Sequence, residues 1–215
     1  MMNPHDVFTE ALNTLPLVAI LRGLPAADAP AIGTALDGEG WRLIEVPLNS
    51  PEPLKSIATL SAALPRALVG AGTVLTPQQV REVHAAGGHL VVAPNFDADV
   101  VRAALQLGMV CLPGVATPSE AFAALAAGAH GLKLFPAELI APPVVKALRA
   151  VLSAQTVLLP VGGITPANMD VYRAAGANGF GLGSALYQPG MDAATVARNA
   201  RSFIEAWRAG SATAR

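Results

Sequence analysis

Short apolar segments alternate with longer helix-like segments along the whole chain, and this alternation constrains the fold more than any other feature. Each apolar segment is rich in Val, Ile and Leu, which is typical of a strand buried on both faces of a helix-covered parallel sheet. Eight such segments occur, at residues 17–21, 42–46, 67–71, 89–93, 109–113, 131–135, 157–161 and 179–183. Eight alternating units predict an α/β fold of the (β/α)8 or TIM-barrel type rather than an open doubly wound sheet.

No linker and no shift in composition divides the chain, so residues 1–215 are predicted to form a single domain. A short N-terminal helix is expected at about residues 4–15, and a flexible C-terminal tail at about residues 209–215. A final amphipathic helix is predicted from Asp192, because apolar residues follow it at the 3.6-residue helical period.

Several of the predicted helices carry start and stop signals. A hydroxyl side chain can cap the first turn, and proline is tolerated at the first helical position. Four Ser-Pro or Thr-Pro pairs fit this pattern, with the hydroxyl residues Ser50, Thr76, Thr117 and Thr165. Gln79 and Glu120 lie three residues after Thr76 and Thr117, which predicts two capping boxes. Left-handed glycine caps are predicted at the helix ends, at Gly87, Gly128 and Gly176.

The composition excludes several classes of partner. The formal net charge is −1, and no basic run is present, so neither nucleic acid nor an anionic membrane is expected to bind. No apolar stretch approaches the length of about 18 residues that a membrane-spanning helix needs. The start of the sequence lacks the pattern of a signal peptide, and a single cysteine, Cys111, suits a reducing compartment. We therefore expect a soluble cytoplasmic protein.

Two charged residues lie within otherwise apolar predicted strands, and they are the first candidates for chemistry. Side chains alternate along a strand, so Lys133 and Glu45 point into the barrel if their leucine, isoleucine and valine neighbours face the helices. Apolar surroundings favour the neutral amine of a lysine, which is the form that attacks a ketone to make a Schiff base. The alternative is a structural ion pair between Glu45 and Lys133. Arg22, which follows the first strand, is either a site residue or a solvated loop residue.

The sequence gives no indication of a metal site. His89 and His130 lie where predicted strands begin, His84 ends a helix and His5 lies near the N-terminus, so none meets other ligands at the mouth. Cys111 lies inside a predicted strand, where cysteine is more often a small buried apolar residue than a nucleophile. No metal is therefore expected.

Glycine-rich segments follow the last two predicted strands. Gly162 and Gly163 follow the seventh strand, and Gly183 and Ser184 follow the eighth. The loops after these strands form the usual phosphate site of such barrels, where backbone N–H groups bind the anion. Glycines also serve turns, but their presence in both loops favours a phosphate site. The segment GAGTVLTP after the third strand lacks the pattern of a P-loop or a dinucleotide loop.

From Leu17 to the last helix, the sequence resembles the class I aldolases that cleave 2-keto-3-deoxy-6-phospho sugar acids. The matching segments, in order, are AILRG, IEVPLNSP, GAGTVL, APN, PGVATPSEA, LKLFPAE, VGGITPAN and GLGSALY. The resemblance implies that Lys133 forms the Schiff base with the substrate and that Glu45 shuttles protons. It further implies substrate contacts at Arg22, Asn49, Thr73, Pro94, Phe135 and Val161, and phosphate contacts at Gly162, Gly163, Gly183 and Ser184. The implied ligands are pyruvate and a phosphorylated sugar acid, the implied assembly is a homotrimer, and no cofactor is implied.

Within this family, the segments ILRG and PLNSP resemble the 6-phosphogalactonate branch, with Asn49 and Val161 in place of an arginine and a threonine of the gluconate branch. The segment FPAE, which ends at Glu138, is instead typical of the gluconate branch. The expected reaction is cleavage of 2-dehydro-3-deoxy-6-phosphogalactonate, and its C4 epimer, or both epimers, is the alternative. A phosphosugar epimerase or isomerase with Glu45 as base, or a phosphosugar-binding barrel without activity, remains as a further alternative.

Overall fold

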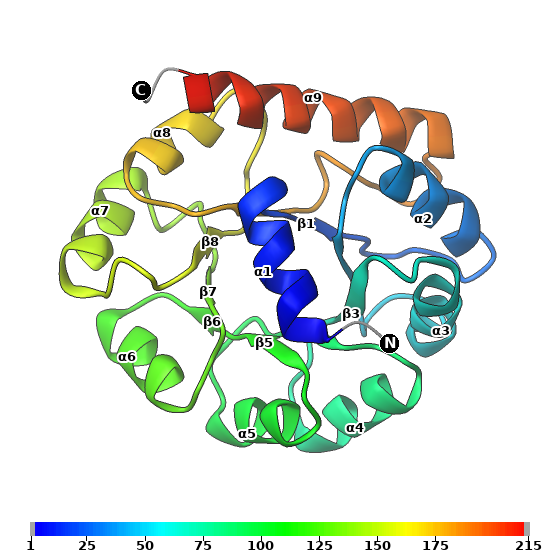
Figure 1. The fold of residues 1–215 in the computed structure, drawn as a ribbon, viewed down its shortest axis with the longest axis horizontal. Helices are drawn as coiled ribbons and strands as arrows, with labels where there is room; N and C mark the ends of the chain where they lie inside the picture. The colour runs from blue at the N-terminus through cyan, green and yellow to red at the C-terminus, as the bar shows by residue number, and fades with distance from the viewer. Residues whose placement is uncertain (1–2, 213–215) are drawn as a thin grey trace.

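The computed structural model describes residues 3–212 and has the predicted barrel architecture, with a central ring of strands inside a ring of helices (Figure 1). The strands are β1 (Leu17–Ile20), β2 (Leu43–Pro47), β3 (Leu68–Gly72), β4 (Leu90–Val92), β5 (Val110–Leu112), β6 (Gly114–Val115), β7 (Leu132–Leu134), β8 (Leu158–Pro160) and β9 (Phe180–Leu182). The helices are α1 (Pro4–Thr14), α2 (Ala29–Gly38), α3 (Pro53–Ala63), α4 (Pro77–Ala85), α5 (Ala98–Gln106), α6 (Pro118–Ala126), α7 (Pro142–Val151), α8 (Met169–Ala174) and α9 (Ala193–Ala212). None of these described helices is long and apolar enough to cross a membrane.

Parallel pairing carries the strands around the barrel. One sheet has the order β5-β4-β3-β2-β1-β9 and the other has the order β6-β7-β8. A parallel bridge between Val161 and Gly181 connects the ends of the two sheets on one side, next to β8 and β9. On the other side the chain passes from β5 to β6 through Pro113, which has no N–H group for a sheet hydrogen bond. Together β5 and β6 occupy the place of the fifth predicted strand.

Two of the four predicted hydroxyl caps are confirmed. The side chain of Thr76 accepts a hydrogen bond from the N–H of Gln79, and Thr117 forms a complete capping box with Glu120. The other two predictions are wrong, because Glu52 precedes α3 and Asn168 precedes α8. The hydroxyl of Ser50 instead accepts a hydrogen bond from the N–H of Gly23, at 2.9 Å, and so joins two loops.

The predicted glycine caps are present, with φ of 84° at Gly87, 96° at Gly128 and 105° at Gly176. Residues 209–212, where a tail was predicted, belong to α9, and residues 213–215 lie outside the described part of the chain. Packing of α9 against α2 and α8 explains why the helix runs further than the sequence pattern suggests.

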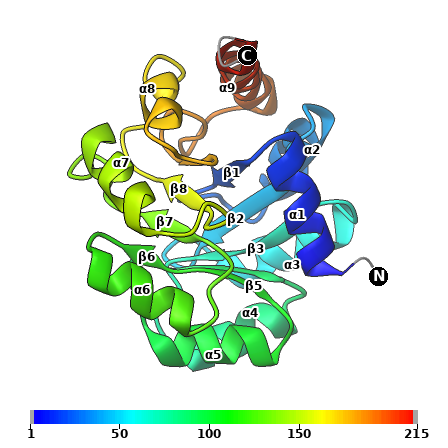
Figure 2. The same cartoon turned by 60° about the vertical axis from the view of Figure 1, so that its left-hand side comes forward.

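The core has two layers. The larger apolar layer lies between the strands and the surrounding helices and includes Ile44, Val46, Leu132 and Leu134. The smaller layer fills the barrel interior and is closed by α1, which crosses one end of the barrel (Figures 1 and 2). Three buried residues of α1, namely Val7, Phe8 and Ala11, pack on interior residues from β1 to β8. The end opposite α1 is therefore the open end, where the carboxyl ends of the parallel strands lie.

Candidate active site

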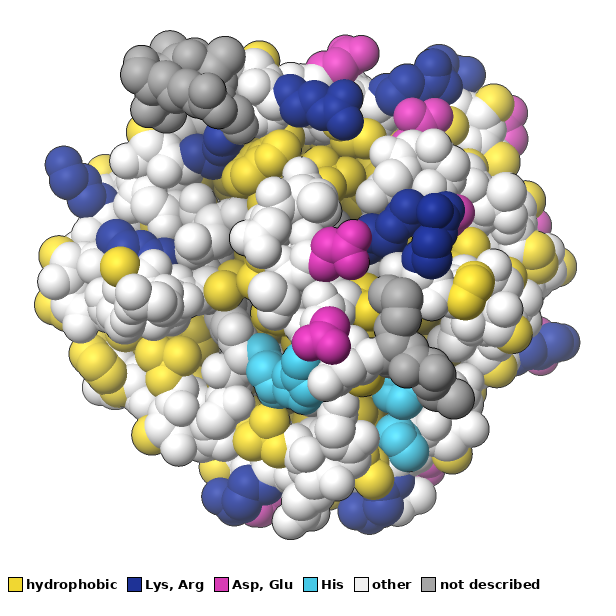
Figure 3. Space-filling model, in the orientation of Figure 1, with side chains coloured by type: hydrophobic (Ala, Val, Ile, Leu, Met, Phe, Trp, Pro, Cys, Tyr) yellow, Lys and Arg dark blue, Asp and Glu magenta, His cyan; other side chains and the backbone are white. Residues whose placement is uncertain are grey.

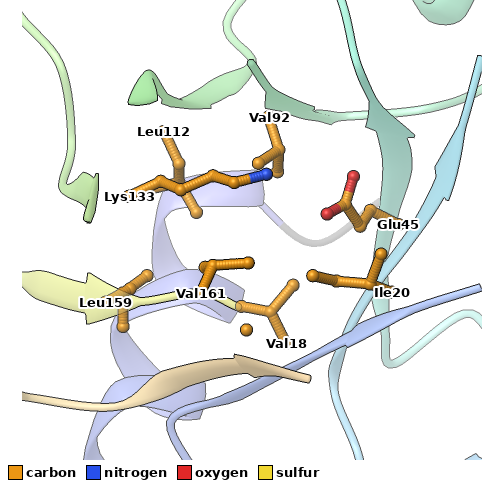
Figure 4. Close-up of a pocket in the computed structure, with 9 residues that line it drawn as sticks. Val18, Ile20, Glu45, Val92, Leu112, Lys133, Leu159 and Val161 are labelled. Atoms are coloured by element: carbon orange, nitrogen blue, oxygen red, sulfur yellow. The ribbon is translucent and has the colours of Figure 1, made fainter. Parts of the chain in front are cut away.

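Lys133 on β7 and Glu45 on β2 point toward one another inside the barrel (Figure 4). The side-chain alternation predicted this arrangement, and the burial of Lys133 (5% exposed) and Glu45 (1% exposed) agrees with it. They share a cavity of about 10 Å³, roughly the space of one water molecule. Its other lining residues are apolar or glycine: Val18, Ile20, Val92, Leu112, Leu159, Val161 and Gly181.

The apolar cavity favours the uncharged forms of both groups. Burial lowers the pKa of Lys133, an effect that the charge of Glu45 opposes and that of Arg22 reinforces. Burial raises the pKa of Glu45, while Lys133 and Arg22 act in the opposite direction. The Oε2 atom of Glu45 is buried without a hydrogen-bond partner among the described residues. An amine with a lowered pKa faces a carboxyl group with a raised pKa, which suits nucleophilic attack and proton transfer.

Gly72, at the end of β3, makes room for the carboxylate of Glu45. A Cβ atom at this position would overlap Oε2 of Glu45 and would lie 2.6 Å from its Cδ atom. Gly72 lies in the segment GAGTVL, whose letters alone do not indicate this role. Thr73 follows with φ of 58°, a left-handed conformation that is rare for a β-branched residue. The end of β3 is therefore shaped around Glu45.

Arg22 and Asn49 are brought together above the cavity. They follow β1 and β2, and the Nη1 atom of Arg22 donates a hydrogen bond of 3.0 Å to Oδ1 of Asn49. Both side chains are exposed, and the charge of Arg22 acts on the pKa of both Lys133 and Glu45. The exposed guanidinium of Arg22 is therefore held by Asn49 at the mouth, a position that suits contact with an anionic ligand.

The remaining predicted substrate contacts lie around the same end of the barrel. The Phe135 ring centroid lies 4.9 Å from Nζ of Lys133, and Val161 lines the cavity. Thr73 and Pro94 follow the carboxyl ends of β3 and β4.

The two glycine-rich loops lie side by side, because the bridge between Val161 and Gly181 pairs the strand ends that lead into them. Gly162 and Gly163 have φ of 114° and 62°, so this turn requires glycine or strains any other residue. In the second loop, the N–H groups of Leu186 and Tyr187 both donate to the carbonyl of Gly183, at 2.8 and 3.0 Å. The turn therefore opens with N–H groups of Gly183 and Ser184 that have no partner within it, the usual arrangement for anion binding.

The described residues contain no group of three His, Cys, Asp or Glu side chains that could hold a metal. His5 stacks on His130, with ring centroids 4.5 Å apart, and His84 meets His89 edge-on at 5.6 Å. Both pairs lie beside α1 at the closed end of the barrel. Cys111 is buried, and burial raises the pKa of its thiol to about 12, which is unsuitable for a nucleophile.

A family model described as KDPG and KHG aldolase matches residues 8–200. A probable 2-dehydro-3-deoxy-6-phosphogalactonate aldolase of Rhizobium meliloti is 48% identical over 90% of this chain and 92% of its own length. The 2-dehydro-3-deoxy-6-phosphogalactonate aldolase of Escherichia coli is 45% identical over 90% of this chain and 95% of its own length. The KHG/KDPG aldolase of Escherichia coli is 36% identical, over 76% of each chain.

Solved structures resemble the chain to a similar degree. A structure described as native KDPGal has a TM-score of 0.90 and 43% identity, covering 92% of this chain and 96% of that one. A designed porous cage made by fusing symmetric oligomeric domains has the same TM-score of 0.90 and 43% identity. The match covers 93% of this chain and 74% of the cage chain. The KDPG aldolase of Legionella pneumophila, with pyruvate captured as a covalent carbinolamine intermediate, has a TM-score of 0.79 and 28% identity, covering 97% and 98%. With the family model matched over most of its length, the chain belongs to the KDPG and KHG aldolase family.

Proposed function

We propose that this chain is a class I aldolase that cleaves 2-dehydro-3-deoxy-6-phosphogalactonate to pyruvate and D-glyceraldehyde 3-phosphate. The observation that carries the proposal is the buried Lys133, whose pKa is lowered by burial and whose amine faces the buried Glu45. The galactonate substrate is supported by the relatives that bear this name at 48% and 45% identity, against 36% for the KHG/KDPG aldolase.

The neutral amine of Lys133 adds to the C2 carbonyl of the substrate to give a carbinolamine. The carboxyl group of Glu45 donates a proton to the carbinolamine hydroxyl, which leaves as water, and an iminium ion and the Glu45 carboxylate remain. The iminium accepts the electron pair of the C3–C4 bond as it breaks, leaving an enamine. The carboxylate of Glu45 takes the proton of the C4 hydroxyl, so that glyceraldehyde 3-phosphate departs as the aldehyde. Glu45 then returns a proton to C3, and water releases pyruvate from Lys133. The carbinolamine captured in the Legionella pneumophila relative supports this sequence.

The rate of this reaction depends on Lys133 as the nucleophile and on Glu45 as the acid–base group. Covalent attachment divides one difficult carbanion step into easier ones. A raised pKa makes the Glu45 carboxylate a stronger base, and positioned acid–base help contributes about 10²- to 10⁴-fold in rate. The proposed reaction uses neither a metal nor an organic cofactor.

The rest of the substrate is proposed to bind along the open end of the barrel. Phosphate binding at the backbone N–H groups of Gly162, Gly163, Gly183 and Ser184 would use remote binding energy to orient the reacting carbons. Arg22, held by Asn49, is proposed to bind the substrate carboxylate or hydroxyl groups. Thr73, Pro94, Phe135 and Val161 are proposed to line the remainder of the site.

A homotrimer in the cytoplasm is part of the proposal. The designed cage built from symmetric oligomeric domains supports an oligomer, as do exposed apolar side chains such as Phe122 (51% exposed) and Leu139 (80% exposed). Light scattering of the purified protein tests this assembly, and a monomer at micromolar concentration would contradict it.

The test of the reaction is sodium borohydride reduction in the presence of pyruvate, followed by intact mass measurement. The wild type is expected to gain one reduced pyruvyl group, and Lys133→Ala none. Lys146→Ala, which removes an exposed lysine on α7, is the matched control and is expected to keep the adduct. A folded wild-type protein without an adduct would reject the aldolase mechanism in favour of an isomerase or a binding protein. Pyruvate release from each C4 epimer then decides the substrate.

A further inference from the structure

Glu138 lies against the glycine turn that we assign to the substrate phosphate, although no role follows for it from the proposed chemistry. A Cβ atom at Gly162 would lie 2.9 Å from Cδ of Glu138, and a Cβ atom at Gly163 would lie 3.2 Å from its Cγ atom. The side chain of Glu138 therefore packs against the turn that forms one wall of the proposed anion site. The side chain is exposed and forms no hydrogen bond or ion pair with another described residue.

The backbone next to Glu138 is fixed on both sides. The N–H group of Ala137 donates to the carbonyl of Val161 at 2.9 Å, which ties this turn to the residue before Gly162. The carbonyl of Ala137 accepts hydrogen bonds from the hydroxyl of Tyr172, at 2.9 Å, and from the N–H group of Ile140, at 3.1 Å. The proximity of Glu138 to the glycine turn is therefore built into the fold.

No cationic side chain described on the neighbouring helices α7 and α8 forms an ion pair with Glu138. On α7, Arg149 donates to the carbonyls of Gly176 and Ser153, and the exposed Lys146 forms no ion pair with Glu138. On α8, Arg173 lies 3.6 Å from Asp170 and donates to the carbonyl of Trp207. Burial raises the pKa of the Tyr172 hydroxyl, and the negative charge of Glu138 adds to this effect. The negative charge of Glu138 therefore acts on the Tyr172 hydroxyl.

We infer that Glu138 makes this end of the site bind a phosphate monoester as the monoanion in preference to the dianion, and is thereby a specificity-determining residue. The inference rests on the proposed function, because the phosphate position is part of it. A second negative charge on the phosphate would lie near the carboxylate of Glu138, which forms no ion pair with another described residue. A phosphate monoester loses its second proton near pH 6, so the repulsion grows between about pH 5 and about pH 8.

The first test compares wild type with Glu138→Gln, which keeps the shape and removes the charge. The measured quantity is the KM for D-glyceraldehyde 3-phosphate in its addition to pyruvate, at about pH 6 and about pH 8. The wild-type KM is expected to rise with pH, whereas Glu138→Gln should show a flatter profile. At the higher pH the variant KM should be about 3- to 10-fold lower, the effect of one partly screened charge at close range. The KM for unphosphorylated D-glyceraldehyde should be equal in both proteins.

Glu52→Gln provides the matched control, since it removes an exposed carboxylate from a different loop at the same end of the barrel. It is expected to leave both KM values and their pH dependence unchanged. Glu138→Ala should reproduce the effect of Glu138→Gln, which excludes an effect of the amide itself. Equal pH profiles in wild type and both Glu138 variants would overturn the inference.

A binding measurement distinguishes failure of the inference about Glu138 from failure of the proposed aldolase function. Calorimetric titration with glycerol 3-phosphate, a phosphate monoester that cannot react, does not depend on turnover. Tighter binding to Glu138→Gln than to wild type at about pH 8, and equal binding at about pH 5, would support the inference even in a protein without aldolase activity. Equal binding at both pH values, in a wild type that forms the pyruvyl adduct, would reject the role of Glu138 and leave the aldolase proposal intact.

Discussion

At the scale of single residues, the carboxylate of Glu45 depends on the absence of a side chain at Gly72. A methyl group at residue 72 would overlap Oε2 of Glu45, so Gly72→Ala must displace the carboxylate from its present position opposite Lys133. We expect kcat to fall by about 10²-fold or more, since positioned acid–base catalysis is lost. Overpacking should also lower the free energy of unfolding by about 1–3 kcal/mol. Pyruvate should still be trapped by borohydride, because Lys133 keeps its place on β7.

Gly38→Ala is a suitable control for this experiment. It also adds one methyl group, at the end of α2, where a Cβ atom would meet nothing within 4 Å. This variant should retain the wild-type kcat. Unchanged turnover in folded Gly72→Ala would show that Glu45 does not need its present position for catalysis.

The alternation of side chains along strands was sufficient to predict that Lys133 and Glu45 point inward. Their apolar neighbours in the sequence, such as Ile44 and Leu134, had to face the helices. The roles of Gly72 and Glu138 could not be predicted in the same way. Each depends on a contact between distant parts of the chain, Glu45 with Gly72 and Glu138 with Gly162, and such contacts follow from the pairing of the strands.

At the scale of secondary-structure elements, the capping box at the start of α6 gives a quantitative prediction. The hydroxyl of Thr117 accepts a hydrogen bond from the N–H of Glu120. The carboxylate of Glu120 in turn accepts hydrogen bonds of 2.9 Å from the N–H groups of Ala116 and Thr117. Thr117→Ala removes the cap and should lower the free energy of unfolding by about 0.5–2 kcal/mol, as measured by denaturant titration.

Thr165→Ala is the matched comparison, because Thr165 also precedes a proline but caps no helix. Asn168 precedes α8, and its Oδ1 atom accepts a hydrogen bond from the backbone N–H of Thr165, which the substitution leaves in place. Thr165→Ala should change stability by less than about 0.5 kcal/mol. Equal losses in the two variants would mean that the cap at Thr117 does not stabilise α6.

The Ser-Pro and Thr-Pro pairs show where local signals fail. A hydroxyl residue before a proline suits a helix cap, but it also suits a turn, and the sequence does not distinguish them. At Ser50 the hydroxyl is used by the N–H of Gly23, which is near only because β1 and β2 are paired. The fifth strand was located correctly, but its interruption at Pro113 depends on how the two sheets meet there.

At the scale of the whole molecule, the two ends of the barrel differ in chemistry. Lys133 and Glu45 line the cavity, and Arg22 lies at the open end. The four histidines of the chain lie at the end closed by α1: His5, His84, His89 and His130. Figure 3 shows histidine side chains gathered beside α1 on this face. The alternation of strand and helix segments in the sequence already predicted His89 and His130 at the beginnings of strands. Their pairing with His84 and His5 required the fold, since α1 crosses the barrel to bring His5 to His130.

This arrangement predicts that acid weakens the closed end of the barrel. His130 accepts a hydrogen bond of 3.1 Å from the N–H of Cys111 through Nδ1, so its neutral form is the one that fits. Burial lowers the pKa of His130 from 6.5 to about 4, and the nearby His5 adds to this effect. As the pH falls below 6.5, the unfolded chain takes up a proton at His130 while the folded protein does not. Stability is therefore fully present above pH 6.5 and is lost progressively toward pH 4.

His130→Asn tests this prediction, because an asparagine Oδ1 atom can accept the hydrogen bond from Cys111 without titrating. The measurement is the denaturant midpoint of wild type and variant at several pH values between about 7.5 and 4.5. The wild type is expected to lose more stability than the variant over this range, so that the gap between the two curves changes with pH. Other groups with lowered pKa values, such as Glu120 and Asp192, contribute to both curves and cancel in the difference. Parallel curves would contradict the prediction and would assign the acid sensitivity of the protein to groups other than His130.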